Sequence, residues 1–335
     1  MIIPFFIPNA ACKHQCIFCD QKAITGEKRP PSSSEIPAKI DEYLRTKSRI
    51  DPVQIAFYGG SFTALPLAVQ QSYLEAIQPF IQSKQIQTIR ISTRPDCITT
   101  DILLFLKKYH VTIVELGAQS LNNDILKRSG RGHTADDTIK SFRLLKEYGF
   151  SCGLQVMVGL PGDSKKIFEQ TITTVIKMTP DFIRLYPLLV IKGTRMEKEY
   201  NDGKYEPLSL ENAVSVCKNA LRMCRAAEIP VIRIGLQPTE ELEQHGTIIA
   251  GPYHPAFRQL VESAIFLEEM QKALAHSNET GKAIFYVHPL DLSAALGQNR
   301  SNVVQLEKEF KRPVLIVPNK TIKKRGSFVT TDKHG

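Results

Sequence analysis

The sequence predicts an α/β protein with a partial, open (β/α)6-type barrel and a small α+β C-terminal domain. Apolar, β-branched runs alternate with amphipathic helical patterns up to about residue 236, which is typical of βαβ units around a parallel sheet. The alternation gives about six or seven units, too many for one small sheet unless it is wide or curled. A doubly wound sheet is the structural alternative. In both folds, ligands bind at the carboxyl ends of the strands.

The expected strands are apolar runs bounded by polar residues or glycine: Ile2–Ile7, Gln54–Tyr58, Thr88–Thr93, Thr112–Leu116, Gly153–Val158, Phe182–Leu188 and Val231–Leu236. The expected helices between them are Ala38–Lys47, Leu67–Gln82, Asp101–Tyr109, Asp136–Tyr148, Lys165–Met178 and Ser209–Ala227. The helix after Thr134 has the clearest signal, because Thr134 and Asp137 form a capping-box pattern and Gly149 follows its last turn.

A second domain is expected over residues 237–335, with the boundary after residue 236. Residues 237–257 look irregular, and Gln259–Leu274 has the pattern of a long amphipathic helix. The rest predicts a strand, two helices joined by a turn, and a strand: Ala283–Val287, Leu292–Leu296, Gly297–Ser301, Asn302–Phe310 and Val314–Pro318.

Composition excludes several classes of protein. Of the 335 residues, 42% are hydrophobic and 23% charged, so a disordered, collagenous or coiled-coil chain is not expected. No apolar run is long enough for a transmembrane helix, and no membrane partner is expected. The apolar N-terminus lacks a basic segment and contains two prolines, so it predicts a first strand rather than a secretion signal. We therefore expect a cytoplasmic protein.

The net charge is +9 and is concentrated at the C-terminal end, where residues 276–335 hold ten basic and five acidic residues. An anionic partner such as nucleic acid is one interpretation of that excess, and a solvated basic tail is the other.

Three of the seven cysteines, Cys12, Cys16 and Cys19, follow the first strand with the spacing C-x-x-x-C-x-x-C. A disulfide cannot use three thiols, and a cytoplasmic setting disfavours one. Zinc is one candidate, with His14 as a possible fourth ligand. A 4Fe–4S cluster with one iron open to another ligand is the second. The spacing alone leaves both open.

Several motifs occur in the same order as in a known family. Cys12-Lys-His-Gln-Cys16-Ile-Phe18-Cys19 matches the radical S-adenosylmethionine signature. The others lie at strand ends or before the fourth helix: Tyr58-Gly-Gly-Ser-Phe-Thr63, Ser92-Thr-Arg-Pro-Asp96, Glu115-Leu-Gly-Ala-Gln-Ser120, Arg128-Ser-Gly-Arg-Gly-His133, Gly159-Leu-Pro-Gly162 and Tyr186 to Thr194. Residues 1–235 thus resemble the radical-SAM half of the Elongator catalytic subunit and its bacterial relatives.

The resemblance implies a cofactor set and a reaction. Cys12, Cys16 and Cys19 would hold three irons of a 4Fe–4S cluster, and S-adenosylmethionine would chelate the fourth. An electron from a reducing partner would cleave the cofactor to methionine and a 5′-deoxyadenosyl radical, which abstracts hydrogen from a substrate. The residues expected near the cofactor are Gly59, Gly60, Ser61, Arg94, Glu115 and Gln119. Catalytic residues beyond these are left open.

Some residues have competing interpretations. Glu115 is either a cofactor contact or a buried carboxylate paired with an arginine. Ser61 stands where many family members have an acidic residue, so a carboxylate–ammonium contact is not assumed there. Arg128, Arg131 and His133 are possible contacts of RNA or of another anion, or a solvated basic turn.

The predicted C-terminal domain resembles a reduced KH module, which clamps nucleic-acid backbone with a G-x-x-G turn between two helices. The turn here is Gly297-Gln-Asn-Arg300, so the second glycine is replaced, and Arg300 is a possible phosphate contact. The alternative is a purely structural domain. The sequence ends before an acetyltransferase domain could fit, so the acetyl-dependent modification of transfer RNA is not expected as its complete reaction.

Three functions follow from these patterns. The first is a radical-SAM enzyme acting on RNA, with transfer RNA as the favoured substrate. The second keeps the same chemistry on a small molecule, as in oxygen-independent coproporphyrinogen oxidase-like proteins. The third is a non-catalytic, zinc-bound RNA-binding protein. The substrate atom, the electron donor and the oligomeric state stay open.

Overall fold

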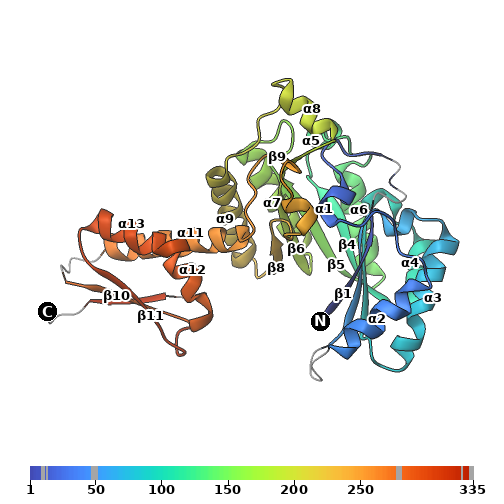
Figure 1. The fold of residues 1–335 in the computed structure, drawn as a ribbon, viewed down its shortest axis with the longest axis horizontal. Helices are drawn as coiled ribbons and strands as arrows, with labels where there is room; N and C mark the ends of the chain where they lie inside the picture. The colour runs from blue at the N-terminus through green and yellow to red at the C-terminus, as the bar shows by residue number, and fades with distance from the viewer. Residues whose placement is uncertain (9–11, 13, 47–51, 277–280, 326, 332–335) are drawn as a thin grey trace. The chain divides into compact units, whose positions relative to one another are not determined.

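The computed structural model describes residues 1–8, 12, 14–46, 52–276, 281–325 and 327–331. The chain forms two compact units (Figure 1). The first, here the barrel unit, contains Met1–Ser209 and Met223–Tyr253; the second, here the C-terminal unit, contains Leu210–Arg222 and His254–Gly335. The predicted boundary after residue 236 stays a prediction.

The barrel unit is built on a curled sheet of seven parallel strands in the order β1-β2-β3-β4-β5-β6-β8. This half-barrel confirms the predicted fold class. The strands are β1 (Ile2–Ile7), β2 (Gln54–Gly59), β3 (Thr88–Thr93), β4 (Val111–Gln119), β5 (Ser151–Val158), β6 (Phe182–Pro187) and β8 (Val231–Ile234). The sheet is open because β1 and β8 are its two edges.

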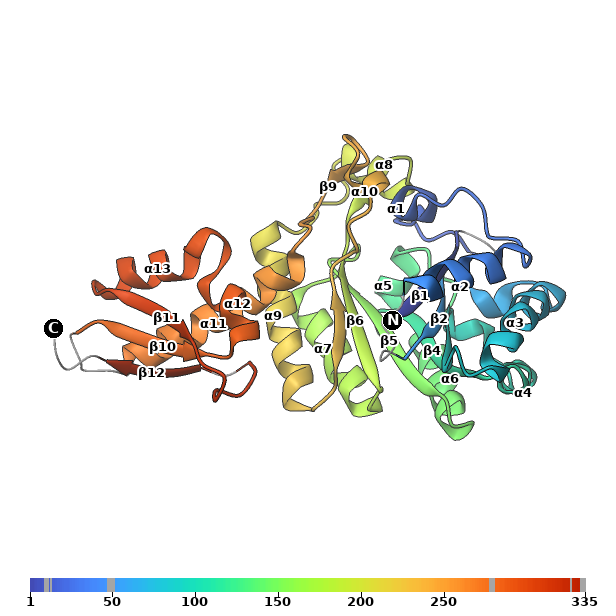
Figure 2. The same ribbon diagram turned by 60° about the horizontal axis from the view of Figure 1, so that its bottom comes forward.

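Helices connect successive strands and lie against one side of the sheet (Figure 2). Their bounds are α1 (Gln21–Thr25), α2 (Glu35–Arg45), α3 (Leu67–Gln82), α4 (Thr100–Lys108), α5 (Asn123–Arg128), α6 (Ala135–Glu147), α7 (Lys165–Met178), α8 (Arg195–Asn201) and α9 (Leu210–Ala226). The predicted capping box of α6 is present, with both Thr134–Asp137 hydrogen bonds formed. Among the described helices, none is long and apolar enough to cross a membrane.

The two faces of the sheet differ in chemistry. On the helix-covered face, Phe57 of β2 stacks on Tyr73 of α3 with ring centroids 5.7 Å apart. On the inner face, polar side chains from neighbouring strands stand side by side, since Ser92 pairs in register with Glu115 and Gln155 with Arg184. Residues alternate between the faces along each strand, so the motif residues are brought to the concave side.

The stretch expected to be irregular, residues 237–257, contains two short elements, so that prediction was wrong in part. These are α10 (Glu240–Glu243) and β9 (Ile248–Ala250), which pairs antiparallel with β7 (Val190–Ile191). Elements of two to four residues are too short to show a period of 3.6 or 2 in the sequence. The Thr239 hydroxyl caps α10 and donates to the carbonyl of Ile24, which ties this stretch to α1.

The C-terminal unit has a three-stranded sheet in the order β11-β10-β12. Its elements are α11 (Phe257–Ala275), β10 (Ala283–Val287), α12 (Leu292–Leu296), α13 (Ser301–Phe310), β11 (Val314–Pro318) and β12 (Ser327–Thr331). The predicted strand–helix–turn–helix–strand order is confirmed, whereas β12 was not predicted. Phe285 of β10, Met270 of α11 and Leu306 of α13 lie in one buried apolar core.

Candidate active site

The three cysteines of the N-terminal motif lie on the loop between β1 and α1. Backbone hydrogen bonds hold this loop on both sides: Ile17 donates to the carbonyl of Ser129 at 3.2 Å and accepts from Met196 at 2.8 Å. The amide of Cys19 donates to the carbonyl of Cys16 at 3.2 Å, forming a tight turn. The loop is therefore anchored to the segment before α6 and to the start of α8.

All nine residues predicted to hold the cluster or the cofactor line one cavity of about 130 Å³, called here the cysteine cavity. The N-terminal loop supplies Cys12, Cys16 and Cys19, and the carboxyl ends of β2, β3 and β4 supply Gly59, Gly60, Ser61, Arg94, Glu115 and Gln119. His14 and Arg131 also line it. The fold thus brings together segments more than 100 residues apart in sequence; the roles of these residues stay predictions.

The thiols of the cavity affect one another electrostatically. Burial raises the pKa of Cys19 to about 12, and the neighbouring Cys16 and Cys12 raise it further. Arg131 opposes this effect and donates from Nη1 to the Cys16 sulfur at 3.2 Å. Its Nη2 donates to the carbonyl of Gly117 at 2.6 Å, which fixes the guanidinium against β4. Bringing several thiolates together here requires a positive charge, which a metal centre supplies.

The donor set fits an iron–sulfur cluster. Within the described part of the chain, no three His, Cys, Asp or Glu side chains are close enough together to hold one metal ion. A 4Fe–4S cluster makes a different demand, because thiolates bind separate irons spread over the cluster. Three cysteine side chains around one cavity meet that demand.

Glycines let the backbone of β2 approach this cavity closely. Gly59 has φ of +91°, and a Cβ there would lie 3.1 Å from the carbonyl oxygen of Ile7. The next amide, of Gly60, donates to that same oxygen at 2.8 Å. A side chain at position 59 would be strained both in backbone conformation and in space.

Two buried donors at the cavity lack a partner among the described residues. The Ser61 hydroxyl is buried and makes no hydrogen bond, and neither does Nη1 of Arg94. The other guanidinium nitrogens of Arg94 donate to the Asp96 carboxylate at 2.9 and 2.8 Å, which fixes its orientation. Buried polar groups are nearly always hydrogen-bonded, so unpaired donors in a cavity indicate a missing ligand.

Glu115 meets both interpretations given to it. Its carboxylate is buried and ion-paired with Arg90 at 2.6 Å and Arg184 at 3.2 Å. It also lines the cysteine cavity. Gln119, in a left-handed conformation at φ of 64°, accepts from Gln155 Nε2 at 3.3 Å.

The other predicted contacts are spread out. Arg131 reaches the cysteine cavity, whereas Arg128 is exposed beside Gly162. His133 is buried and donates from Nε2 to the carbonyl of Ala118 at 3.2 Å; burial, and then Arg131, lower its pKa to about 4. Arg300 is exposed and lies in the C-terminal unit.

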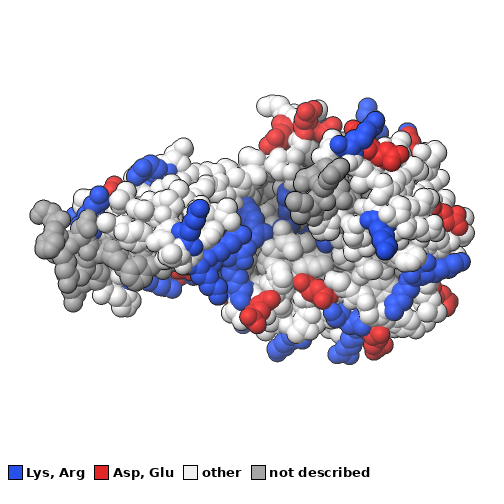
Figure 3. Space-filling model, turned by 90° about the horizontal axis from the view of Figure 1, so that it is seen from below, with Lys and Arg blue, Asp and Glu red and all other residues white. Residues whose placement is uncertain are grey.

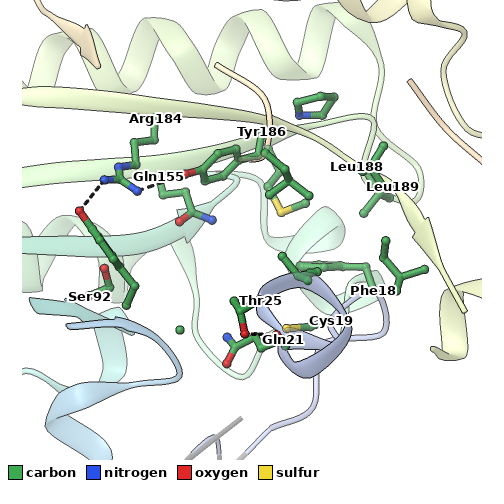
Figure 4. Close-up of a pocket in the computed structure, with 17 residues that line it drawn as sticks. Phe18, Cys19, Gln21, Thr25, Ser92, Gln155, Arg184, Tyr186, Leu188 and Leu189 are labelled. Atoms are coloured by element: carbon green, nitrogen blue, oxygen red, sulfur yellow. Dashed lines mark hydrogen bonds between the residues drawn. The ribbon is translucent and has the colours of Figure 1, made fainter. Parts of the chain in front are cut away.

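A second cavity of about 220 Å³, called here the adjoining cavity, shares Phe18, Cys19 and Gln155 with the first. Figure 4 shows Arg184 and Tyr186 on one side of it and Phe18 and Cys19 on another. Sequence reasoning assigned no role to Gln155 or Arg184. Their place two and four residues before known motifs on β5 and β6 would have put them on the inner face.

The chain belongs to the radical SAM superfamily: residues 6–175 match that family, and residues 180–266 match the Radical_SAM C-terminal domain. It is therefore an enzyme of the radical SAM class.

Among relatives, the chain is similar to the tRNA uridine(34) acetyltransferase of Methanocaldococcus infernus, with 30% identity over 261 residues, 65% of this chain and 48% of the relative. The oxygen-independent coproporphyrinogen-III oxidase-like protein HemZ of Bacillus subtilis is 28% identical over 186 residues, 55% of this chain and 36% of the relative. The chain spans about half the length of the Elongator-type relatives it matches. These matches confirm the resemblance to the radical-SAM half of that family.

Solved structures share the fold. An Elongator-type protein from M. infernus with residues 1–46 deleted superposes with a TM-score of 0.62 at 23% identity, covering 81% of this chain and 63% of that one. Coproporphyrinogen III oxidase from Escherichia coli gives a TM-score of 0.51 at 16% identity, covering 68% of this chain and 52% of the other.

Proposed function

We propose that this enzyme cleaves S-adenosylmethionine reductively at a 4Fe–4S cluster and uses the resulting radical on RNA. The observation that carries the first part is the cysteine cavity, where three cysteines face glycine-rich strand ends and two unpaired buried donors. When bound and reduced, the cluster supplies the electron that breaks the sulfonium bond and yields methionine and a 5′-deoxyadenosyl radical.

The residues of the cavity divide this work. Cys12, Cys16 and Cys19 would bind three irons and leave one for the cofactor's amino and carboxylate groups. Gly59 and Gly60 allow the backbone to approach the cofactor. The unpaired donors of Ser61 and Arg94 match its acceptor oxygens, and a donor to a charged oxygen forms a strong hydrogen bond. Glu115 and Gln119 would close the β4 side.

RNA is the favoured substrate because the Elongator-type relatives carry names that refer to tRNA uridine. The charge of the C-terminal unit supports this. Lys218, Arg222 and Lys272 surround one carboxylate, Glu268, at 2.7, 2.6 and 2.9 Å, which leaves excess positive charge. Lys and Arg side chains also gather on the face drawn in Figure 3. Phosphate contacts by such residues give binding that weakens with salt.

A small-molecule substrate is the second candidate. The similarity to the coproporphyrinogen oxidase-like protein and the largely apolar wall of the adjoining cavity favour it. RNA binding distinguishes the two candidates.

Anaerobic reconstitution tests the reaction. The reduced protein should form 5′-deoxyadenosine from S-adenosylmethionine, and Cys16→Ala should abolish both product and cluster absorbance. Cys152→Ala is the matched control, since Cys152 is buried in β5 away from both cavities. Turnover retained by Cys16→Ala, or zinc bound at one per chain in place of iron, would contradict the proposal.

Titration with transfer RNA at several salt concentrations tests the substrate. We expect affinity to fall steeply with salt and the slope to decrease by about one on Arg300→Ala. The exposed Lys166 on α7 gives the control variant Lys166→Ala. Salt-independent or absent RNA binding would favour the small molecule.

A further inference from the structure

The adjoining cavity is organised by one arginine and two tyrosines. Arg184 of β6 donates from Nη2 to the Tyr58 hydroxyl at 3.0 Å and from Nη1 to the Tyr186 hydroxyl at 3.2 Å. Its Nε lies 3.2 Å from Oε2 of Glu115, and its guanidinium carbon lies 4.9 Å from the centroid of the Tyr58 ring. Figure 4 shows the guanidinium bonded to both hydroxyls. Both tyrosines line the cavity.

Each tyrosine oxygen keeps a proton that it can donate. Arginine has only donors, so both hydroxyl oxygens are acceptors toward Arg184, and their own O–H groups point elsewhere. Burial raises the pKa of Tyr58 above its ordinary value of 10, which keeps this hydroxyl protonated at neutral pH. Among the described residues, neither hydroxyl proton has an acceptor. A group that enters the cavity can supply those acceptors.

The donors that face the cavity are neutral. The charge of Arg184 is turned to the two hydroxyls and to Glu115, and Arg90 shares the same carboxylate at 2.6 Å. A carboxylate or phosphate is best bound by a free guanidinium fork, which Arg184 no longer offers. A neutral carbonyl oxygen is matched by a hydroxyl donor.

The remaining wall is mostly apolar and suits a flat ring. Phe18, Met157, Leu188, Leu189 and Leu236 contribute to it. Ligand sites of this kind bind an apolar body through such side chains and fix its orientation with a few polar groups.

We propose that the adjoining cavity binds the neutral carbonyl edge of a planar ring of nucleobase type, with Tyr58 and Tyr186 donating to its oxygens. Arg184 is then a positioning residue that holds both hydroxyls. This inference rests on the proposed function only in taking the cavity beside the cysteine cavity as the substrate side.

Ligand binding to the cluster-loaded protein, with S-adenosylmethionine saturating, tests this. The probes are uridine, which has two ring carbonyls, its 2,4-difluorotoluene isostere, which lacks good acceptors, and benzoate as an anion. Ligand-observed NMR titration should give a dissociation constant for uridine at least 10-fold lower than for either other probe. Each hydroxyl lost, in Tyr58→Phe and Tyr186→Phe, should weaken uridine binding about 5- to 10-fold. Tyr148→Phe, outside both cavities, is the matched control.

Equal affinity for uridine and its isostere in the wild-type protein would overturn the proposal, and that comparison needs no variant to fold. Tighter binding of benzoate, no binding of uridine, or uridine affinity unchanged in folded Tyr→Phe variants would also overturn it. Formation of 5′-deoxyadenosine, measured on the same samples, reports separately on the proposed function. A protein that binds uridine through the tyrosines without cleaving the cofactor would refute the reaction and support this site.

Discussion

The barrel unit and the C-terminal unit use their buried polar side chains differently. In the C-terminal unit these side chains bond to backbone and hold turns: Asn302 donates to the carbonyls of Ser263 and Ala295 at 3.0 Å each. In the barrel unit, buried charges bond to other side chains and line cavities, as Glu115 does with Arg90 and Arg184. Buried charges contribute little net stability. Where they surround a cavity, they therefore indicate function rather than folding.

Removing the central charge should have the largest effect. Glu115→Gln leaves Arg90 and Arg184 buried without their counter-charge, and breaking a buried ion pair costs about 3–5 kcal/mol. Urea unfolding, with amide exchange assigned to the barrel strands, measures the loss. A loss under about 1 kcal/mol would mean that the network is solvated and that the contrast between the units is wrong.

Acidification should destabilise the barrel unit through His133. Its pKa is lowered from 6.5 to about 4, mainly by burial, so the unfolded chain binds more protons between these values. Stability therefore falls as pH drops through that window, by about 2 kcal/mol between pH 7 and pH 5. His133→Gln should remove this slope in pH-dependent unfolding. The same slope in both proteins would assign the effect to other groups.

The C-terminal unit should lose less from its own buried polar residue. Asn302→Ala removes the donor to two buried carbonyls and should cost about 1–3 kcal/mol. Amide exchange in β10 and β11 should report this loss, while iron content stays at the wild-type level. A loss of iron in this variant would show that the two units are not distinct in this respect.

An exposed pair should matter least. Lys146 and Asp181 are both partly exposed at 2.9 Å, and such pairs contribute about 0–1 kcal/mol. Lys146→Gln should change the unfolding free energy by under about 1 kcal/mol, with a smaller change at high salt. A larger, salt-independent effect would place functional-type pairing outside the cavities.

The sequence predicted much of the fold and of the cysteine cavity. Period-2 and period-3.6 patterns placed the long elements, and Gly59-Gly60 and the cysteine spacing stood out locally. It missed α10, β9 and β12, which carry no periodic signal over a few residues. It also missed Arg184 with Tyr58 and Tyr186, because a hydrogen bond between β2 and β6 depends on curvature of the sheet. Pairing of Glu115 with two arginines was foreseen only as one alternative.

The account centres on an open iron that S-adenosylmethionine occupies beside three cysteines. The most direct test is the electron paramagnetic resonance spectrum of the reduced protein, with and without S-adenosylmethionine labelled with nitrogen-15 at its amino group. We expect a 4Fe–4S signal that shifts on addition and shows coupling to the labelled nitrogen. A cluster signal that the cofactor leaves unchanged, or no cluster signal from fully reconstituted protein, would contradict the account.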